Sequence, residues 1–125
     1  MKASLNSLHH QITDWLRETD FYKQEISILE KRLQEVAAKN NSQEVLAEVE
    51  HFQNKFILNK EQLDILTHDL NKEESVVEEK AKQTPEHINE KFVPVFDKMQ
   101  ERVKIFATGF ADLRFEFNIF LSKTI

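Results

Sequence analysis

Over residues 5–36 the chain reads "LNSLHHQITDWLRETDFYKQEISILEKRLQEV". Its large side chains recur at alternating spacings of three and four residues, and Thr19 is the only weak member of the series. In an α-helix this spacing places the recurring side chains on one stripe, as in the seam of a coiled coil. The stretch therefore predicts one long helix, over residues 4–39, that is packed along its whole length. The series is Leu5, Leu8, Ile12, Trp15, Thr19, Tyr22, Ile26, Leu29, Leu33 and Val36.

A second series with this spacing runs from Val45 to Val77, with Asn59 and Glu73 as polar interruptions. It predicts a second helix over residues 42–83. The segment "KNNSQE" (39–44) separates the two helices. Asn40 is suited to the left-handed conformation that ends a helix, and Asn41 or Ser42 is suited to cap the next one. Because residues 69–83 are rich in charge and poor in large apolar side chains, we expect them to be the least stable part of the bundle.

A third series runs from Ile88 to Phe120 and predicts a helix over residues 85–122. The segment "TPEH" (84–87) has the character of a helix start, since Thr84 can cap and Pro85 suits the first helical position. Pro94 falls inside the series. Proline removes a backbone hydrogen bond and crowds the preceding turn, so we expect a kink near residues 90–94.

The chain of 125 residues contains one glycine and two prolines, too few for the many tight turns of a sheet protein. Short loops between long helices of similar length make successive helices antiparallel neighbours. The predicted fold is therefore all-α: an antiparallel up-down-up three-helix bundle of long helices with coiled-coil-like packing. We expect a single helical-bundle domain over residues 1–125.

Charge and composition narrow the classes of function. The net charge of −5 argues against nucleic acid or an anionic membrane as a general partner. No window approaches the roughly 18 uninterrupted apolar residues of a spanning helix, so no integral membrane association is expected. The absence of cysteine excludes disulfides and thiol catalysis, and it fits a reducing compartment. With no signal-peptide pattern near the start, a cytoplasmic location is the expectation.

Five of the ten phenylalanines lie in the last stretch, "FATGFADLRFEFNIFLSKTI" (106–125). On a helical wheel, four of them share one arc with Leu113 and upstream members of the third series. These four are predicted to be one wall of the core: Phe106, Phe110, Phe117 and Phe120. A membrane-surface role for this terminus is the alternative, and the acidic charge counts against it. Gly109 lies at the edge of the arc, and we expect Ile26 or Phe56 to pack closely against it.

Phe115 points away from that arc, and it has counterparts on the other helices. Apolar side chains seven residues apart lie off each of the first two seams, and counting from the first loop places Phe21 near the height of Leu58. Apolar pairs on faces that should meet solvent indicate an interaction surface. The alternative is that a wide bundle interior covers some of them. The predicted protein interface is Phe21, Ile28, Leu58, Ile65, Phe115 and Ile119, and its occupant is a second copy, giving a homodimer, or a helical protein partner.

Histidines are the residues most suited to catalysis or metal binding here. In an up-down-up bundle, His9 and His10 meet the end of the second helix and the start of the third, where His87 lies. Imidazole and carboxylate are zinc ligands, so a bundle that binds a metal or small ligand at this end is the alternative function. The carboxylates near it are Glu74, Glu78, Glu79, Glu86 and Glu90.

Nothing in the sequence resembles the active site of an enzyme. One glycine excludes a phosphate-binding loop, a dinucleotide fingerprint and a nucleophile elbow. A di-iron bundle needs two inward Glu-x-x-His motifs, and the chain has one, from Glu48 to His51. We therefore expect a non-catalytic helical interaction module without a cofactor.

Overall fold

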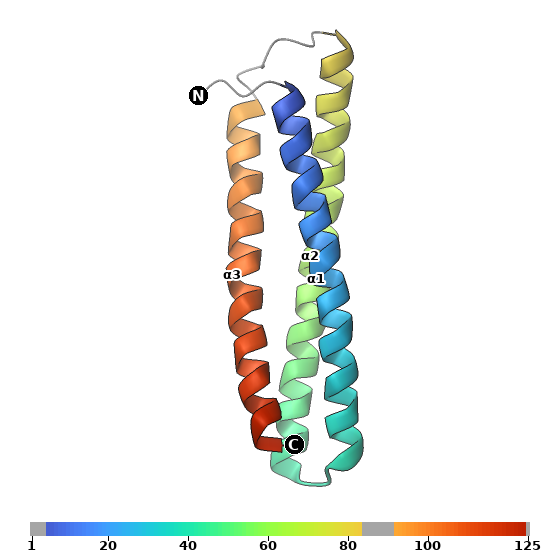
Figure 1. Cartoon of the computed structure of the whole chain (residues 1–125), viewed down its shortest axis with the longest axis vertical. Coiled ribbons are helices and arrows are strands. Elements are labelled where there is room, and N and C mark those ends of the chain that lie inside the picture. Colours follow the sequence, from blue (N-terminus) through green and yellow to red (C-terminus); the bar gives the residue numbers. More distant parts are fainter. Residues whose placement is uncertain (1–4, 84–91, 125) are drawn as a thin grey trace.

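A computed structural model describes residues 5–83 and 92–124, which form three α-helices (Figure 1). These are α1 (Leu5–Lys39), α2 (Gln43–Gln83) and α3 (Phe92–Thr124). In Figure 1 the chain descends through α1, returns through α2 and descends again through α3. The described residues contain no strand, so the predicted all-α three-helix bundle is confirmed.

Hydrogen bonds satisfy the helix ends on both sides of the loop between α1 and α2. The side-chain amide of Asn40 donates to the carbonyl oxygen of Val36 at 2.8 Å. The backbone N–H of Leu46 donates to the carbonyl oxygen of Ser42 at 2.9 Å, so Ser42 holds the cap position of α2. No described residue other than glycine has a positive φ, so the left-handed conformation predicted for Asn40 is wrong. The Asn40 side chain satisfies a carbonyl group at the end of α1, in place of a left-handed backbone turn.

The start of the third helix lies largely outside the described residues. Thr84, Pro85 and the first two residues of the segment predicted to kink, Glu90 and Lys91, belong to residues 84–91. Within the described part, α3 spans Phe92–Thr124, and Pro94 lies near the beginning of this range. The helix continues to Thr124, two residues beyond the predicted end.

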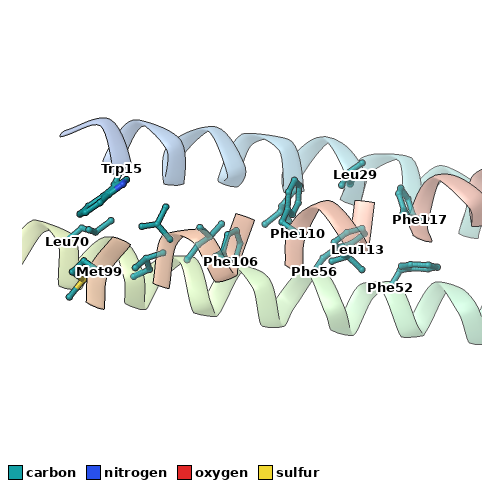
Figure 2. Packing of buried hydrophobic residues seen from close by; sticks show 14 of the residues in the cluster. Trp15, Leu29, Phe52, Phe56, Leu70, Met99, Phe106, Phe110, Leu113 and Phe117 are labelled. Atoms are coloured by element: carbon teal, nitrogen blue, oxygen red, sulfur yellow. The ribbon is translucent and has the colours of Figure 1, made fainter. Parts of the chain in front are cut away.

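The predicted seams form the hydrophobic core. Figure 2 shows labelled side chains of all three helices pointing into the space between them. The weak member of the first series, Thr19, is buried, and its hydroxyl donates to the carbonyl oxygen of Leu16 at 2.8 Å. This local bond lets a polar residue occupy the core. Asn59 and Glu73, the polar interruptions of the second series, are half-buried.

The four phenylalanines predicted to face inward are buried, as expected. The ring of Phe117 lies 5.2 Å from those of Phe52 and Phe56 in α2. Nearer the middle of α3, Phe106 and Phe110 lie 5.3 and 5.2 Å from Tyr22 of α1. Aromatic pairs at these separations contribute roughly 0.5–1.5 kcal/mol beyond their buried area. The aromatic wall thus joins α3 to both other helices.

Gly109 is not a point of close contact between helices. It is exposed, and a Cβ atom built on it would have nothing within 4 Å. The prediction that Ile26 or Phe56 packs against it is wrong. Both of those side chains are fully enclosed elsewhere in the core. The spacing placed Gly109 at the edge of the inward arc, and the actual orientation of α3 turns that edge toward solvent.

Replacement of Gly109 by alanine is therefore expected to stabilise the protein by about 0.5–1 kcal/mol. Alanine lowers the conformational entropy of the unfolded chain and meets no clash in the folded one. Urea denaturation followed by far-UV circular dichroism measures the change. The converse substitution, Ala111→Gly on the same exposed helix, should destabilise by a similar amount. A loss of stability in Gly109→Ala would show that a close contact exists at this position.

Candidate interaction surfaces

All six residues of the predicted interface are exposed, with between 41% and 67% of their surface accessible. Phe115, two residues before the fully buried Phe117, has the largest value. The interior of the bundle therefore does not cover them. Three of the six line two grooves, one on each side of α3: Phe21 and Phe115 line the first, and Ile65 lines the second.

The first groove lies between α1 and α3, and we call it the α1–α3 groove. It is lined by Phe21 and Tyr22 of α1 and by Phe110, Arg114 and Phe115 of α3, with smaller residues between them. Phe21 and Phe115 are 94 residues apart in the sequence, and the fold brings them to one surface. Ile28 extends the groove's apolar edge, because seven residues make two helical turns and return to the same stripe of α1.

Charged groups border the α1–α3 groove as well. Arg114 of α3 lies 3.8 Å from the carboxylate of Glu25 in α1, with both side chains partly accessible. A pair this exposed contributes little to stability. It does supply one charge of each sign beside the apolar residues.

The second groove, the α2–α3 groove, is lined by Gln62 and Ile65 of α2 and by Arg102 and Ile105 of α3. Arg102 also donates to Asp69 at 2.8 Å. Leu58 precedes Ile65 by seven residues and lies on the same stripe of α2. Ile119 follows Ile105 by two heptads, which places it on the same stripe of α3.

Sequence reasoning missed Ile105, which is 64% exposed. The signal was present, because Ile105 and Ile119 are fourteen residues apart and both lie off the third seam. The other exposed large apolar residues among the described ones do not continue these stripes at seven-residue spacing. They are Leu46, Ile57, Val76 and Val93.

Ion pairs between α1 and α2 show which exposed residues of the two helices lie at the same level. Lys23 lies 3.3 Å from Asp64, which brings Phe21 to the level of Ile65. Glu30 lies 2.9 Å from Lys60, which brings Ile28 to the level of Leu58. Counting from the loop had paired Phe21 with Leu58, about two turns away from its actual level. The α1–α3 groove borders residues 107–118 of α3 and the α2–α3 groove borders residues 102–106, so the two grooves follow one another along α3.

Tyr22, in the wall of the α1–α3 groove, has an altered acidity. Burial raises the pKa of its phenol to about 12 from the ordinary 10.0, and Glu18 adds to the effect. The Tyr22 hydroxyl donates to a carboxylate oxygen of Glu18 at 2.9 Å. Both the bond and the negative charge favour the protonated phenol.

A pH titration tests this environment, since Tyr22 is the only tyrosine of the chain. The phenolate absorbance should rise with a midpoint near 12 in the folded protein and near 10.0 in concentrated urea. The unfolded chain loses this proton first, so the phenol's contribution to stability is complete below pH 10 and is lost toward pH 12. The Tyr22→Phe protein should lack this phenolate contribution, whereas its lysines should titrate as those of the wild type do. Equal midpoints in the folded and unfolded states would contradict the assignment.

At the opposite end from the α1–α2 loop, three residues of the predicted histidine-rich cluster come together. They are His9 of α1 and Glu74 and Glu78 of α2. The Nδ1 atom of His9 lies 3.5 Å from a carboxylate oxygen of Glu74. His10 and Glu79 are exposed and do not join the group. Glu86, His87 and Glu90 lie outside the described residues.

The single Glu-x-x-His motif does not face the interior, because Glu48 and His51 are both exposed on α2. None of the three described helices combines the length and apolar character needed to cross a membrane. Comparison with known proteins found no match among family models, curated proteins or solved structures.

Proposed function

We propose that this protein is a non-catalytic helical interaction module that packs against another protein chain through the α1–α3 and α2–α3 grooves. One observation supports the proposal above others: exposed apolar side chains seven residues apart, Phe21 with Ile28 on α1 and Leu58 with Ile65 on α2, lie on the helices that flank α3. The exposed side chains of Ile105, Phe115 and Ile119 lie on α3 itself. Burying such a side chain contributes roughly 1.5–3 kcal/mol. A further helix laid along a groove between two helices covers residues with this spacing.

A second copy of the chain is the occupant that we propose first. In a two-fold dimer the same surface is used on both partners, so an apolar stripe on one copy meets the same stripe on the other. Each groove carries charges of both signs, Glu25 with Arg114 and Asp69 with Arg102. A two-fold arrangement can therefore pair opposite charges around the apolar residues. A partner with a strongly basic face would need an excess of negative charge, and each groove carries charges of both signs.

Sedimentation equilibrium at tens of micromolar protein tests self-association. The wild type should form a dimer, and Phe21→Lys with Leu58→Lys should shift it to monomer, because each lysine would bury a charge in the contact. Gln34→Lys with Gln53→Lys is the matched control, since it adds the same charge at exposed polar positions of the same helices. Two acidic chains repel each other, so added salt should strengthen the dimer.

The outcomes separate the two forms of the proposal. A wild type that stays monomeric at low and high salt excludes self-association and leaves a different helical protein as the occupant. Dimers that persist in the Phe21→Lys, Leu58→Lys protein would exclude these residues as the contact. Separate substitutions, Phe115→Lys for the α1–α3 groove and Ile65→Lys for the α2–α3 groove, assign the contact to one side of α3.

A further inference from the structure

The cluster of His9, Glu74 and Glu78 combines one imidazole with two carboxylates from two helices. One potential ligand atom from each residue lies within 4.8 Å of the others. Glu74 and Glu78 are one turn apart on α2, so their carboxylates lie on the same side of that helix. His9 reaches them from α1, which the core holds against α2 in this register.

The contact between His9 and Glu74 does not have the geometry of a hydrogen bond. The separation of 3.5 Å exceeds the usual range of about 2.7–3.2 Å. The Nδ1 atom is buried and has no hydrogen-bond partner. A buried polar atom without a partner is uncommon in folded proteins and requires an explanation.

This distance is compatible with a tetrahedral metal site. Zinc binds histidine nitrogen and carboxylate oxygen at about 2.0–2.2 Å, which separates neighbouring ligand atoms by about 3.4 Å. The observed separation of Nδ1 and the Glu74 oxygen is close to that value. The electrostatics agree, because two carboxylates one turn apart repel each other and a dication between them removes the repulsion.

We propose that His9, Glu74 and Glu78 bind one divalent transition-metal ion, with Zn²⁺ the best match to one nitrogen and two oxygen donors. Magnesium and calcium prefer oxygen ligands alone. Three protein ligands leave a fourth position for water or another donor. Glu78 is exposed, and an open pocket lined by Asn6, His9, Glu78 and Lys82 gives an ion access to the site.

The site would join the start of α1 to the last turns of α2. Residues 69–83 contain few large apolar side chains, and two of them, Leu70 and Val77, are buried in the core. A metal ion bound by both helices stabilises the folded state in proportion to its occupancy, since the unfolded chain does not hold the ligands together. Zinc should therefore slow hydrogen exchange most at these two helix ends. This inference is independent of the proposed interaction surfaces, which border α3.

Isothermal titration of the chelator-treated, dialysed protein with zinc chloride at neutral pH tests the site. We expect one ion per chain, and affinity weakened by about tenfold or more in Glu78→Gln and in His9→Ala. Binding should also weaken as the pH falls, because protons compete with the metal for imidazole. The matched controls are Glu79→Gln, one residue from Glu78 and also exposed, and His68→Ala; both should bind as the wild type does.

Three results would overturn the proposal, and the first two are no saturable binding by the wild type and unchanged affinity in Glu78→Gln. Glu78 is exposed, so its substitution leaves the fold intact and decides the question even if His9→Ala unfolds. Loss of binding in His68→Ala but not in His9→Ala would place the ion elsewhere and would equally reject the site.

Discussion

Replacing Phe117 by alanine is expected to lower the free energy of unfolding by about 3–5 kcal/mol. The Phe117 side chain is completely enclosed, and its ring packs on Phe52, Phe56 and Phe120. Removing it loses the transfer free energy of the ring and leaves a cavity that neighbouring rings cannot fill without moving. Because a domain of this kind has only about 5–15 kcal/mol of stability, the loss is a large fraction of the total. Urea denaturation followed by circular dichroism measures it.

Phe115→Ala is the matched control, since it makes the same chemical change two residues away on the same helix. Phe115 is 67% exposed, so its removal should change the free energy of unfolding by no more than about 0.5 kcal/mol. The measurement is made at the lowest protein concentration that gives a signal, so that self-association does not contribute. Equal losses in the two variants would mean that α3 is rotated from the orientation described above.

Replacing Ile26 by alanine is expected to cost about 2–5 kcal/mol. Ile26 is fully buried in the middle of α1. An unfilled cavity there weakens the packing of α1 against the other helices, and the helical backbone has no way to close it without disturbing the seam. The loss is measured by the same denaturation experiment.

Ile28→Ala is the control for α1, because Ile28 is 50% exposed and lies two residues from Ile26. Its effect on stability should be within about 0.5 kcal/mol. A cost for Ile28→Ala as large as that for Ile26→Ala would show that another part of the chain covers this side of α1.

The two control residues also connect stability with the proposed function. Phe115 and Ile28 are exposed and contribute little to the folded monomer. Phe115 lines the α1–α3 groove, and Ile28 lies on the same stripe of α1 as Phe21, which lines that groove too. Their alanine variants should fold normally and self-associate more weakly. Buried residues such as Phe117 should behave in the opposite way, with a loss of stability and no specific change at the groove.

The heptad spacing was sufficient to predict the three helices and the residues that face inward. Each buried member of the first series could be identified because periodicity is a local property of a helix. The same reasoning found six exposed apolar residues, and it missed Ile105 only because its partner Ile119 is fourteen residues away. Periodicity could not predict the environment of Gly109. This residue lies at the edge of the inward arc, and a small rotation of the helix decides whether it faces the core or solvent.

The sequence by itself therefore determined the all-α class, the approximate bounds of the first two helices, the end of the third and the stripe that each helix buries. Only the tertiary structure decided how those stripes are rotated and shifted against each other. Packing among three helices sets both quantities, and it placed Phe21 level with Ile65, lined two grooves with exposed residues and left Gly109 in solvent. The meeting of His9 with Glu74 and Glu78 has the same origin. It depends on the axial register of α1 against α2, which side chains from both helices fix together and neither helix encodes alone.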